Sequence, residues 1–311
     1  MEPSQPLQPE RLTVGSASAG RLDRVLADWL GLSRGAVLRL LDTGGLTCNG
    51  RTMTRKHKGS PLFVGDELVC DGRYAGGETP APDSALVLEE LQQGDGWLVV
   101  NKPEGVPVRP HALDEIGTVI NALAASHPSI VGVGEGGLRS GVVHRLDTDT
   151  SGALLVATES DAWHRLRGAF AEHRVVKRYE ALLHGVPEES SSSELHLRVA
   201  KHAPAHVEVV EHAVDGDGSR SCSLGWQVLE RFGDRACRVE IDLHTGFLHQ
   251  VRVMMSHLGH PVIGDTQYGE GEDRQLASRQ MLHAKSLAYE SITAQAPLPA
   301  DFLAVMDVMR R

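Results

Sequence analysis

Aromatic residues and cysteines are scarce in this chain of 311 residues: Phe, Trp and Tyr together make up 4%, and there are four cysteines. The cysteines form no CxxC pair and no dense framework, which argues against a disulfide scaffold and predicts reduced thiols. No apolar stretch approaches the roughly 20 residues that span a bilayer, and the N-terminus lacks the pattern of a signal peptide. The sequence therefore predicts a globular cytoplasmic protein without a membrane partner.

Negative charge dominates the chain as a whole, at a formal −10, but it is unevenly distributed. Between residues 11 and 73 there are ten Lys and Arg against six Asp and Glu, whereas the rest has 21 against 35. Salt screens charges that lie more than roughly 10 Å apart, so a phosphate responds to the local sign. The net charge therefore does not exclude nucleic acid, and the N-terminal segment is the part expected to contact it.

Two helix patterns and a hairpin signal follow one another near the N-terminus. Apolar residues recur at helical spacing from Leu22 to Leu30, and Ser33 is a candidate N-cap of a second helix. Glycines at 44 and 45 are expected to end that helix. Asn49-Gly50 between short apolar runs predicts a two-residue hairpin, with a further strand over residues 66–70.

Composition divides the chain into four parts. Residues 1–16 are interpreted as a flexible tail, 17–72 as a small domain, 73–85 as a linker and 86–311 as a larger domain. Mixed strand and helix patterns predict an α+β fold for the chain. Strands are expected over 97–101, 153–157, 177–183 and 236–243, helices over 160–174, 248–258 and 299–310, and a solvated loop over 188–194.

Two patterns that suggest a cofactor or metal site lack the flanking structure or spacing that such a site requires. Gly132, Gly134 and Gly137 match the dinucleotide-binding pattern GxGxxG, but no strand precedes them and no helix follows, so a loop is expected. The histidines between His244 and His260 lack the i, i+4 spacing of a helical metal site and have no cysteine nearby. No metal site is predicted.

Residues 141–152, GVVHRLDTDTSG, are the most informative stretch of the chain. Asp147 lies where an extended segment meets a polar turn, from which a carboxylate can point into a cleft. The alternative is that Asp147 or Thr150 only caps the turn, a common role of these residue types. A glycosidase pair is not supported, because Asp149 lies too close along the chain to straddle a sugar with Asp147.

His144-Arg145-Leu146-Asp147, followed by Thr150-Ser151-Gly152, resembles the signature of the RluA-type RNA pseudouridine synthases. Further motifs of that family recur in order over about residues 86–290. They are Asn101-Lys102-Pro103 with Gly105, Lys177 and Tyr179 in KRYEALLHG, Thr245-Gly246 with His249-Gln250-Val251-Arg252, GHPVIGDTQYG, and Leu282-His283-Ala284.

This resemblance implies that the chain converts uridine in RNA to pseudouridine, without metal or organic cofactor. It implies a mixed, largely antiparallel central sheet flanked by helices. Large-subunit ribosomal RNA is the expected substrate and transfer RNA the alternative, and a monomer is expected. Catalytically silent RNA binding, as in a ribosome-assembly factor, is the second hypothesis, and a nucleoside hydrolase the third.

The resemblance also assigns expected roles to single residues. Asp147 becomes the essential carboxylate, Arg252 its cationic partner and Tyr179 the aromatic that stacks on the target uracil. From the residues alone, a surface ion pair for Arg252 and a core position for Tyr179 stay open. Expected substrate-binding residues are His144, Arg145, Lys102, Lys177, His249 and Gln250.

Residues 19–72 separately resemble the S-four type of RNA-binding domain. As a set, its cations favour phosphate contact, although each one alone could be an ordinary solvated charge. They are Arg21, Arg24, Arg34, Arg39, Arg51, Arg55, Lys56 and Lys58. Three positions depart from the synthase pattern: Phe247 stands where the family usually has Arg, and Met254 and Arg109 stand where it has His. Phe247 and Met254 flank the expected site helix, so these two concern substrate choice more than chemistry.

Overall fold

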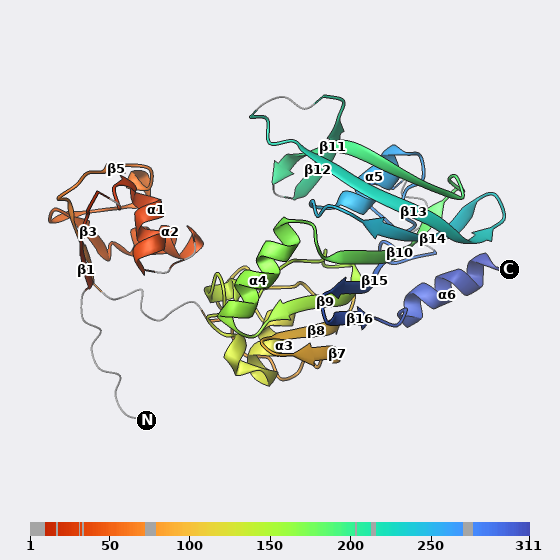
Figure 1. The fold of residues 1–311 in the computed structure, drawn as a ribbon, viewed down its shortest axis with the longest axis horizontal. Coiled ribbons are helices and arrows are strands. Elements are labelled where there is room, and N and C mark those ends of the chain that lie inside the picture. The colour runs from red at the N-terminus through yellow and green to blue at the C-terminus, as the bar shows by residue number, and fades with distance from the viewer. Residues whose placement is uncertain are drawn as a thin grey trace.

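The computed structural model of the chain describes residues 10–16, 18–30, 32, 34–71, 79–202, 204–212, 216–269 and 276–311 (Figure 1). Its N-terminal part, up to residue 71, has an apolar core of its own, made of residues between Val14 and Cys70. Two helices and short antiparallel strands surround this core. They are β1 (Glu10–Thr13), β2 (Gly20–Arg21), α1 (Leu22–Leu30), α2 (Arg34–Thr43), β3 (Leu46–Cys48), β4 (Arg51–Thr52), β5 (Pro61–Leu62) and β6 (Glu67–Cys70).

The predicted helices and hairpin of this N-terminal part are present. Leu22, Val25 and Leu26 of α1 are buried, as the helical spacing indicates. Asn49 and Gly50, with φ of 50° and 76°, form the tight turn between β3 and β4. The candidate N-cap Ser33 lies outside the described residues.

One expectation for the N-terminus is wrong. Residues 10–13, assigned to a flexible tail, form β1 and pair with β6 in antiparallel register, Leu12 opposite Leu68. The reason is that β6 otherwise leaves an open edge, and Leu12 and Val14 add apolar surface to the core when β1 covers it. This part of the chain therefore contains more strand than the sequence predicts.

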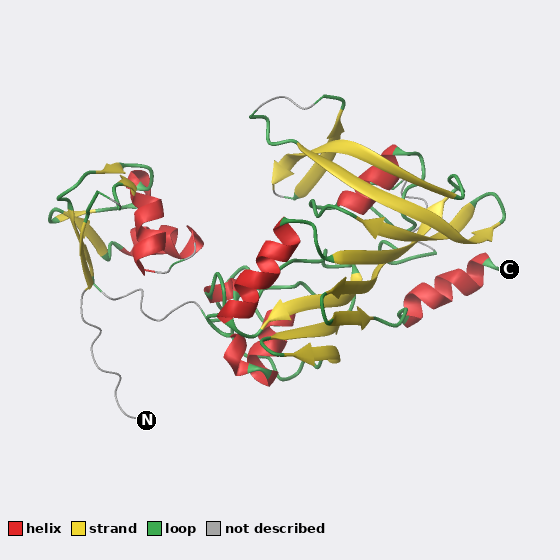
Figure 2. Ribbon diagram, viewed as in Figure 1, coloured by secondary structure: helices red, strands yellow, loops and turns green. Residues whose placement is uncertain are grey.

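Residues 89–295 are dominated by a ten-stranded sheet in the order β12-β11-β13-β14-β10-β15-β9-β8-β7, with β16 beside β15 (Figure 2). The strands are β7 (Glu89–Gly94), β8 (Trp97–Lys102), β9 (Ser151–Ala157), β10 (Val176–His184), β11 (Ser190–His202), β12 (Ala205–Val210), β13 (Arg220–Phe232), β14 (Ala236–Leu243), β15 (Leu282–Tyr289) and β16 (Ile292–Gln295). Neighbours are antiparallel except β9 and β15, which run parallel through His283–Ser151 and Ala284–Gly152. The expected mixed, largely antiparallel sheet is confirmed.

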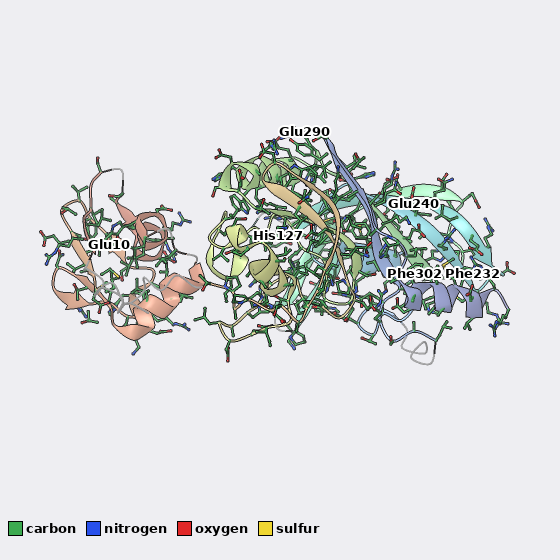
Figure 3. The ribbon with its side chains drawn as sticks, turned by 90° about the horizontal axis from the view of Figure 1, so that it is seen from below. Glu10, His127, Phe232, Glu240, Glu290 and Phe302 are labelled. Carbon is green, nitrogen blue, oxygen red and sulfur yellow. The ribbon has the colours of Figure 1, made fainter. Side chains whose placement is uncertain are left out.

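Helices cover both faces of this sheet. The helices are α3 (Val119–Ser126), α4 (Ser160–Ala171), α5 (Gln250–His257) and α6 (Ala300–Met309). Alternate residues of β8 and β9 belong to two apolar clusters: α3 and α5 pack into one, and α4 packs into the other. Burial on both faces explains why WLVV and ALLVA are continuous apolar runs. A separate apolar cluster forms around α6. Phe302 of α6 is fully buried in it, and Phe232 packs against it (Figure 3).

The strands and helices predicted within residues 86–311 are present in the structure, but one predicted loop of this part is not. Residues 188–194 were expected to be a solvated loop, but Ser190–His202 form β11, which pairs with β13. Its serines satisfy their backbone groups in the ladder while their small polar side chains lie toward solvent, a pattern that composition alone assigns to a loop. Within the described residues, no helix combines the length and apolarity required to cross a membrane.

Candidate functional site

Asp147 lies in the turn that leads into β9, with 19% of its side chain exposed. The Thr150 N–H donates to the Asp147 main-chain carbonyl at 3.1 Å, so the turn uses the backbone of Asp147. Its carboxylate is directed elsewhere: Oδ2 accepts a hydrogen bond from Arg252 Nη1 at 3.1 Å. The geometry therefore favours the projecting carboxylate over the turn cap.

Arg252 is held between two carboxylates. Its Nε and Nη2 donate to Oδ2 and Oδ1 of Asp265 at 2.6 and 2.9 Å, while Nη1 faces Asp147. The Arg252 side chain is 8% exposed, which does not fit a surface ion pair. Burial alone would raise the pKa of Asp265, but the hydrogen bonds and charge of Arg252 hold it below its usual value. The site thus contains two carboxylates around one fixed guanidinium.

A second set of contacts surrounds the same guanidinium. His249 Nδ1 lies 2.8 Å from the Tyr268 hydroxyl, which accepts from the Val207 N–H at 2.9 Å. The hydroxyl retains its own proton and is placed to donate it to Nδ1, while Nε2 of His249 lies 4.0 Å from Asp147 Oδ1. The Tyr268 ring centroid is 5.1 Å from the Arg252 guanidinium carbon. Burial lowers the pKa of His249, so the ring is neutral near pH 7.

Asp147, Arg252 and Tyr179 line one cavity of about 600 Å³. Tyr179 lies on β10, and the alternation of the strand places its ring on the same side as α5. Burial, and then the charge of Asp147, raise the pKa of its hydroxyl, so it is neutral. Asp147, Arg252 and His249 also line a smaller cavity of about 330 Å³, and the exposed Arg145 lines both. The three residues expected to be catalytic are therefore brought together.

Two of the expected substrate-binding cations point into the protein. Lys102 is fully buried, and its Nζ donates to the carbonyls of Pro103, Val106 and Thr148 at 2.7–2.8 Å. Burial lowers its pKa to about 7. Lys177 lines the larger cavity but donates to the Thr245 carbonyl at 2.7 Å, and burial lowers its pKa to about 8. This geometry favours support of the Asp147 turn by Lys102 over direct contact with a substrate.

His144 and Gln250 also organise the walls of the site. His144 stacks on Phe170, and its Nε2 accepts from the Leu155 N–H at 3.0 Å, while burial lowers its pKa to about 3. Gln250 Oε1 accepts from the Thr245 hydroxyl and the Phe247 N–H. Both residues line the larger cavity, and their polar atoms hold neighbouring segments in place.

Three contributing residues were not singled out from the sequence: Asp265, Tyr268 and Arg279. The first two stand in the quoted motif GHPVIGDTQYG, but spacing alone does not show that they contact Arg252 and His249. Arg279 is buried and donates to the Asp149 carbonyl at 2.9 Å and to Asp301 at 2.6 Å, which ties the Asp147 turn to α6. No local pattern marks Arg279.

The three departures from the family pattern have different surroundings. Met254 is fully buried in the core and lines neither cavity. Phe247 lines the larger cavity, and Arg109 lines the smaller one, where its Nη1 donates to the Pro110 carbonyl. Only the last two positions can therefore touch a ligand of this site.

The cations of the N-terminal part fall into three groups. Arg21 is hydrogen-bonded to Asp23 and Arg55 to Asp42, while the side chains of Arg34 and Arg39 lie outside the described residues. The remaining candidates are exposed: Arg24, Arg51, Lys56 and Lys58.

Comparison with known proteins bears on the same segments. Residues 96–257 match the family described as RNA pseudouridylate synthase. An uncharacterised RNA pseudouridine synthase of Synechocystis is 33% identical over 99% of this chain and 96% of its own length. Ribosomal large subunit pseudouridine synthase D of Pseudomonas aeruginosa is 32% identical, over 94% and 92%. The structure of human RNA pseudouridylate synthase domain containing 1 aligns with a TM-score of 0.56 at 31% identity, covering 73% of this chain and 89% of that one.

Proposed function

Because this chain belongs to the RNA pseudouridine synthases, which are isomerases, we propose that it converts specific uridines of large-subunit ribosomal RNA to pseudouridine. We further propose that Asp147 is the essential carboxylate and that no cofactor takes part. The choice of ribosomal RNA is supported by the name of the Pseudomonas aeruginosa relative. The observation that carries the catalytic proposal is the contact of Asp147 with Arg252 in a cavity that Tyr179 also lines.

The reaction exchanges one bond of the ribose for another. The bond from C1′ to uracil N1 breaks, a bond from C1′ to C5 forms, C5 loses a proton and N1 gains one. This balance needs neither oxidant nor reductant. Asp147 is proposed to act as a nucleophile at C1′ or as a base, and the hydrogen bond from Arg252 holds its carboxylate in place for either route.

Tyr179 is proposed to stack on the target uracil, since an aromatic face holds an extruded base by roughly 1–3 kcal/mol. A uridine in a helix must first be flipped out at a cost of a few kcal/mol, so unpaired or weakly paired uridines are the expected targets. Arg145, which is exposed and lines both cavities, is proposed to help fill the space that the extruded nucleotide vacates.

The chain is proposed to consist of two functional units. The first is an RNA-binding domain of the S-four type over residues 17–72, to which β1 adds residues 10–13. The second, over residues 86–311, performs the chemistry. Their separate apolar cores support this division.

The test compares Asp147→Asn with Asp149→Asn, a matched exposed carboxylate two residues away. Purified wild-type protein and Asp149→Asn are expected to form pseudouridine in ribosomal RNA at similar rates. Asp147→Asn is expected to lose at least about 100-fold, as for removal of an acid–base group or nucleophile. Wild-type turnover by Asp147→Asn would overturn the catalytic assignment. Mapping pseudouridine across cellular RNA with and without the protein identifies the target, and modification confined to transfer RNA would overturn the ribosomal proposal.

A further inference from the structure

We propose that the part of the larger cavity formed by α4 and the start of β13 binds a phosphodiester of the RNA, with Arg220 as its principal cation and Arg167 as its second. The inference rests on the proposed function, because it takes RNA as the substrate. It adds the place where the backbone next to the target uridine is held.

The wall of the larger cavity is rich in positive charge. The described residues that line it include five Lys and Arg side chains and one carboxylate, Asp147. The chain as a whole carries a formal charge of −10. Cations are thus concentrated at this cavity in an otherwise acidic protein, and a concave wall with one sign of charge attracts ligands of the opposite sign.

Arg167 and Arg220 remain available to bind a ligand. Arg252 is committed to Asp265 and Asp147, and the Lys177 ammonium donates to a carbonyl. Arg167 uses one N–H on the Val143 carbonyl at 2.8 Å and retains the others of its five. Arg220 is exposed, and across the described part of the chain its guanidinium has no hydrogen bond or ion pair.

A second arginine on the same strand allows a direct comparison with Arg220. Arg231, also on β13 and also exposed, is neutralised by Glu189 at 2.6 Å. It does not line the cavity. Arg220 therefore differs from an ordinary strand arginine of this protein both in its position and in its lack of a described partner.

The larger cavity has enough volume for a nucleotide and its phosphodiester. A volume of about 600 Å³ lies in the middle of the range for ligand sites, roughly 300–1,000 Å³. Tyr179 and Asp147 account for the uracil and the ribose. Since Asp147 repels a phosphate, the phosphodiester is expected beside the cations that α4 and β13 contribute.

The experiment is a double-mutant cycle between protein and RNA. One arm compares wild type, Arg220→Gln and Arg167→Gln, with Arg231→Gln as the matched control from β13. The other arm compares a short single-stranded RNA with one uridine against the same RNA with neutral methylphosphonate linkages on either side of it. Dissociation constants are measured between 50 and 200 mM salt, alongside turnover.

We expect Arg220→Gln to weaken binding of the normal RNA about tenfold at low salt and to reduce the slope of log affinity against log salt by about 0.7. KM is expected to rise while kcat changes less than twofold. Arg220→Gln is expected to be insensitive to the neutral linkages, to which wild type and Arg231→Gln respond. If the losses of affinity caused by Arg220→Gln and by the neutral linkages simply add, the proposal is overturned. If Arg220 and the flanking phosphates are coupled in binding but no pseudouridine forms, only the proposed function is overturned. If pseudouridine forms but this coupling is absent, only the present inference is overturned.

Discussion

Arg252 makes two hydrogen bonds to the buried Asp265 and one to the partly buried Asp147. Asp265 therefore fixes the plane of the guanidinium, and the remaining N–H group faces Asp147. A bidentate contact also restricts rotation, which a single bond does not. We therefore expect Asp265 to act on Asp147 through Arg252, as a positioning residue.

Replacement of Asp265 by Asn is the test of this arrangement. The change leaves the guanidinium without its buried counter-charge, which typically costs about 3–5 kcal/mol of unfolding free energy. We expect a lower urea midpoint and a loss in kcat that exceeds the change in KM. Asp242→Asn, which removes an exposed partner of Arg178, is the control and is expected to change unfolding by about 0–1 kcal/mol. Equal changes in the two variants contradict the positioning role.

The sequence allowed prediction of the contact between Asp147 and Arg252, because the motif order supplied both residues. It did not show that Asp265 binds Arg252, because that contact depends on the turns after α5 that bring residue 265 back to the helix. Nor did it show that the Lys102 ammonium is enclosed by three carbonyls, since a lysine beside a motif equally suits a ligand. The chemical roles of these residues stay predictions.

The junction of β9 and β15 is a close contact between two strands near the site. Gly152 has a φ of 117°, and a Cβ there would collide with the main chain of Ala284. The glycine thus lets the two strands pair in parallel immediately after the Asp147 turn.

Gly152→Ala and Gly168→Ala form a matched pair of glycine substitutions. Gly152→Ala is expected to destabilise the protein by several kcal/mol, roughly 3 or more, because both the backbone angle and the space forbid a methyl group. Gly168 lies within α4 with nothing near its Cβ position, so Gly168→Ala is expected to stabilise by about 0.5–1 kcal/mol. Thermal and urea unfolding measure both, and a stable, active Gly152→Ala would show that the junction tolerates separation.

His283 gives the same junction a dependence on pH. It is fully buried, its Nδ1 lies 2.9 Å from the Ser151 hydroxyl, and burial lowers its pKa to about 4. The unfolded chain, with an ordinary pKa near 6.5, binds more protons between these values. Stability is therefore complete above about pH 6.5 and is lost as pH falls toward 4, by at most about 1.4 kcal/mol per pH unit.

His283→Gln is expected to lower stability at pH 7 but to flatten its decline between pH 7 and 5. Urea midpoints at the two values measure the slope. His164→Gln, at an exposed position of α4, serves as the control and is expected to keep the wild-type slope. An unchanged slope in His283→Gln would exclude His283 as its source.

At the scale of elements, periodicity and apolar runs were sufficient for β8, β9, β14 and the five predicted helices, which are α1, α2, α4, α5 and α6. They failed for β1 and β11, whose existence depends on a partner strand distant in sequence rather than on their own residues. Polar edge segments of this kind have no local signal that separates them from loops.

At the scale of the whole molecule, the exposed cations of the N-terminal part are expected to add affinity without adding chemistry. Replacing Arg51, Lys56 and Lys58 by Gln is expected to weaken RNA binding and to reduce its salt slope by up to about 0.9 per lost contact. Turnover at saturating RNA is expected to stay within about twofold, because none of the three lines the cavities. Salt titrations and saturation kinetics measure this, with Arg21→Gln and Arg55→Gln as ion-paired controls, and an unchanged slope contradicts the RNA-binding assignment.

The parallel pairing between β9 and β15 rests on a register of two residue pairs, and residues of the site come from either side of it. Asp147 arrives on the side of β7, β8 and β9, whereas Tyr179, His249 and Arg252 arrive from β10, β14 and α5. We therefore expect a slight twist between β9 and β15 to separate the Asp147 carboxylate from the Arg252 guanidinium before any strand unfolds. Turnover should consequently disappear at lower denaturant concentrations than those at which the protein's circular dichroism changes.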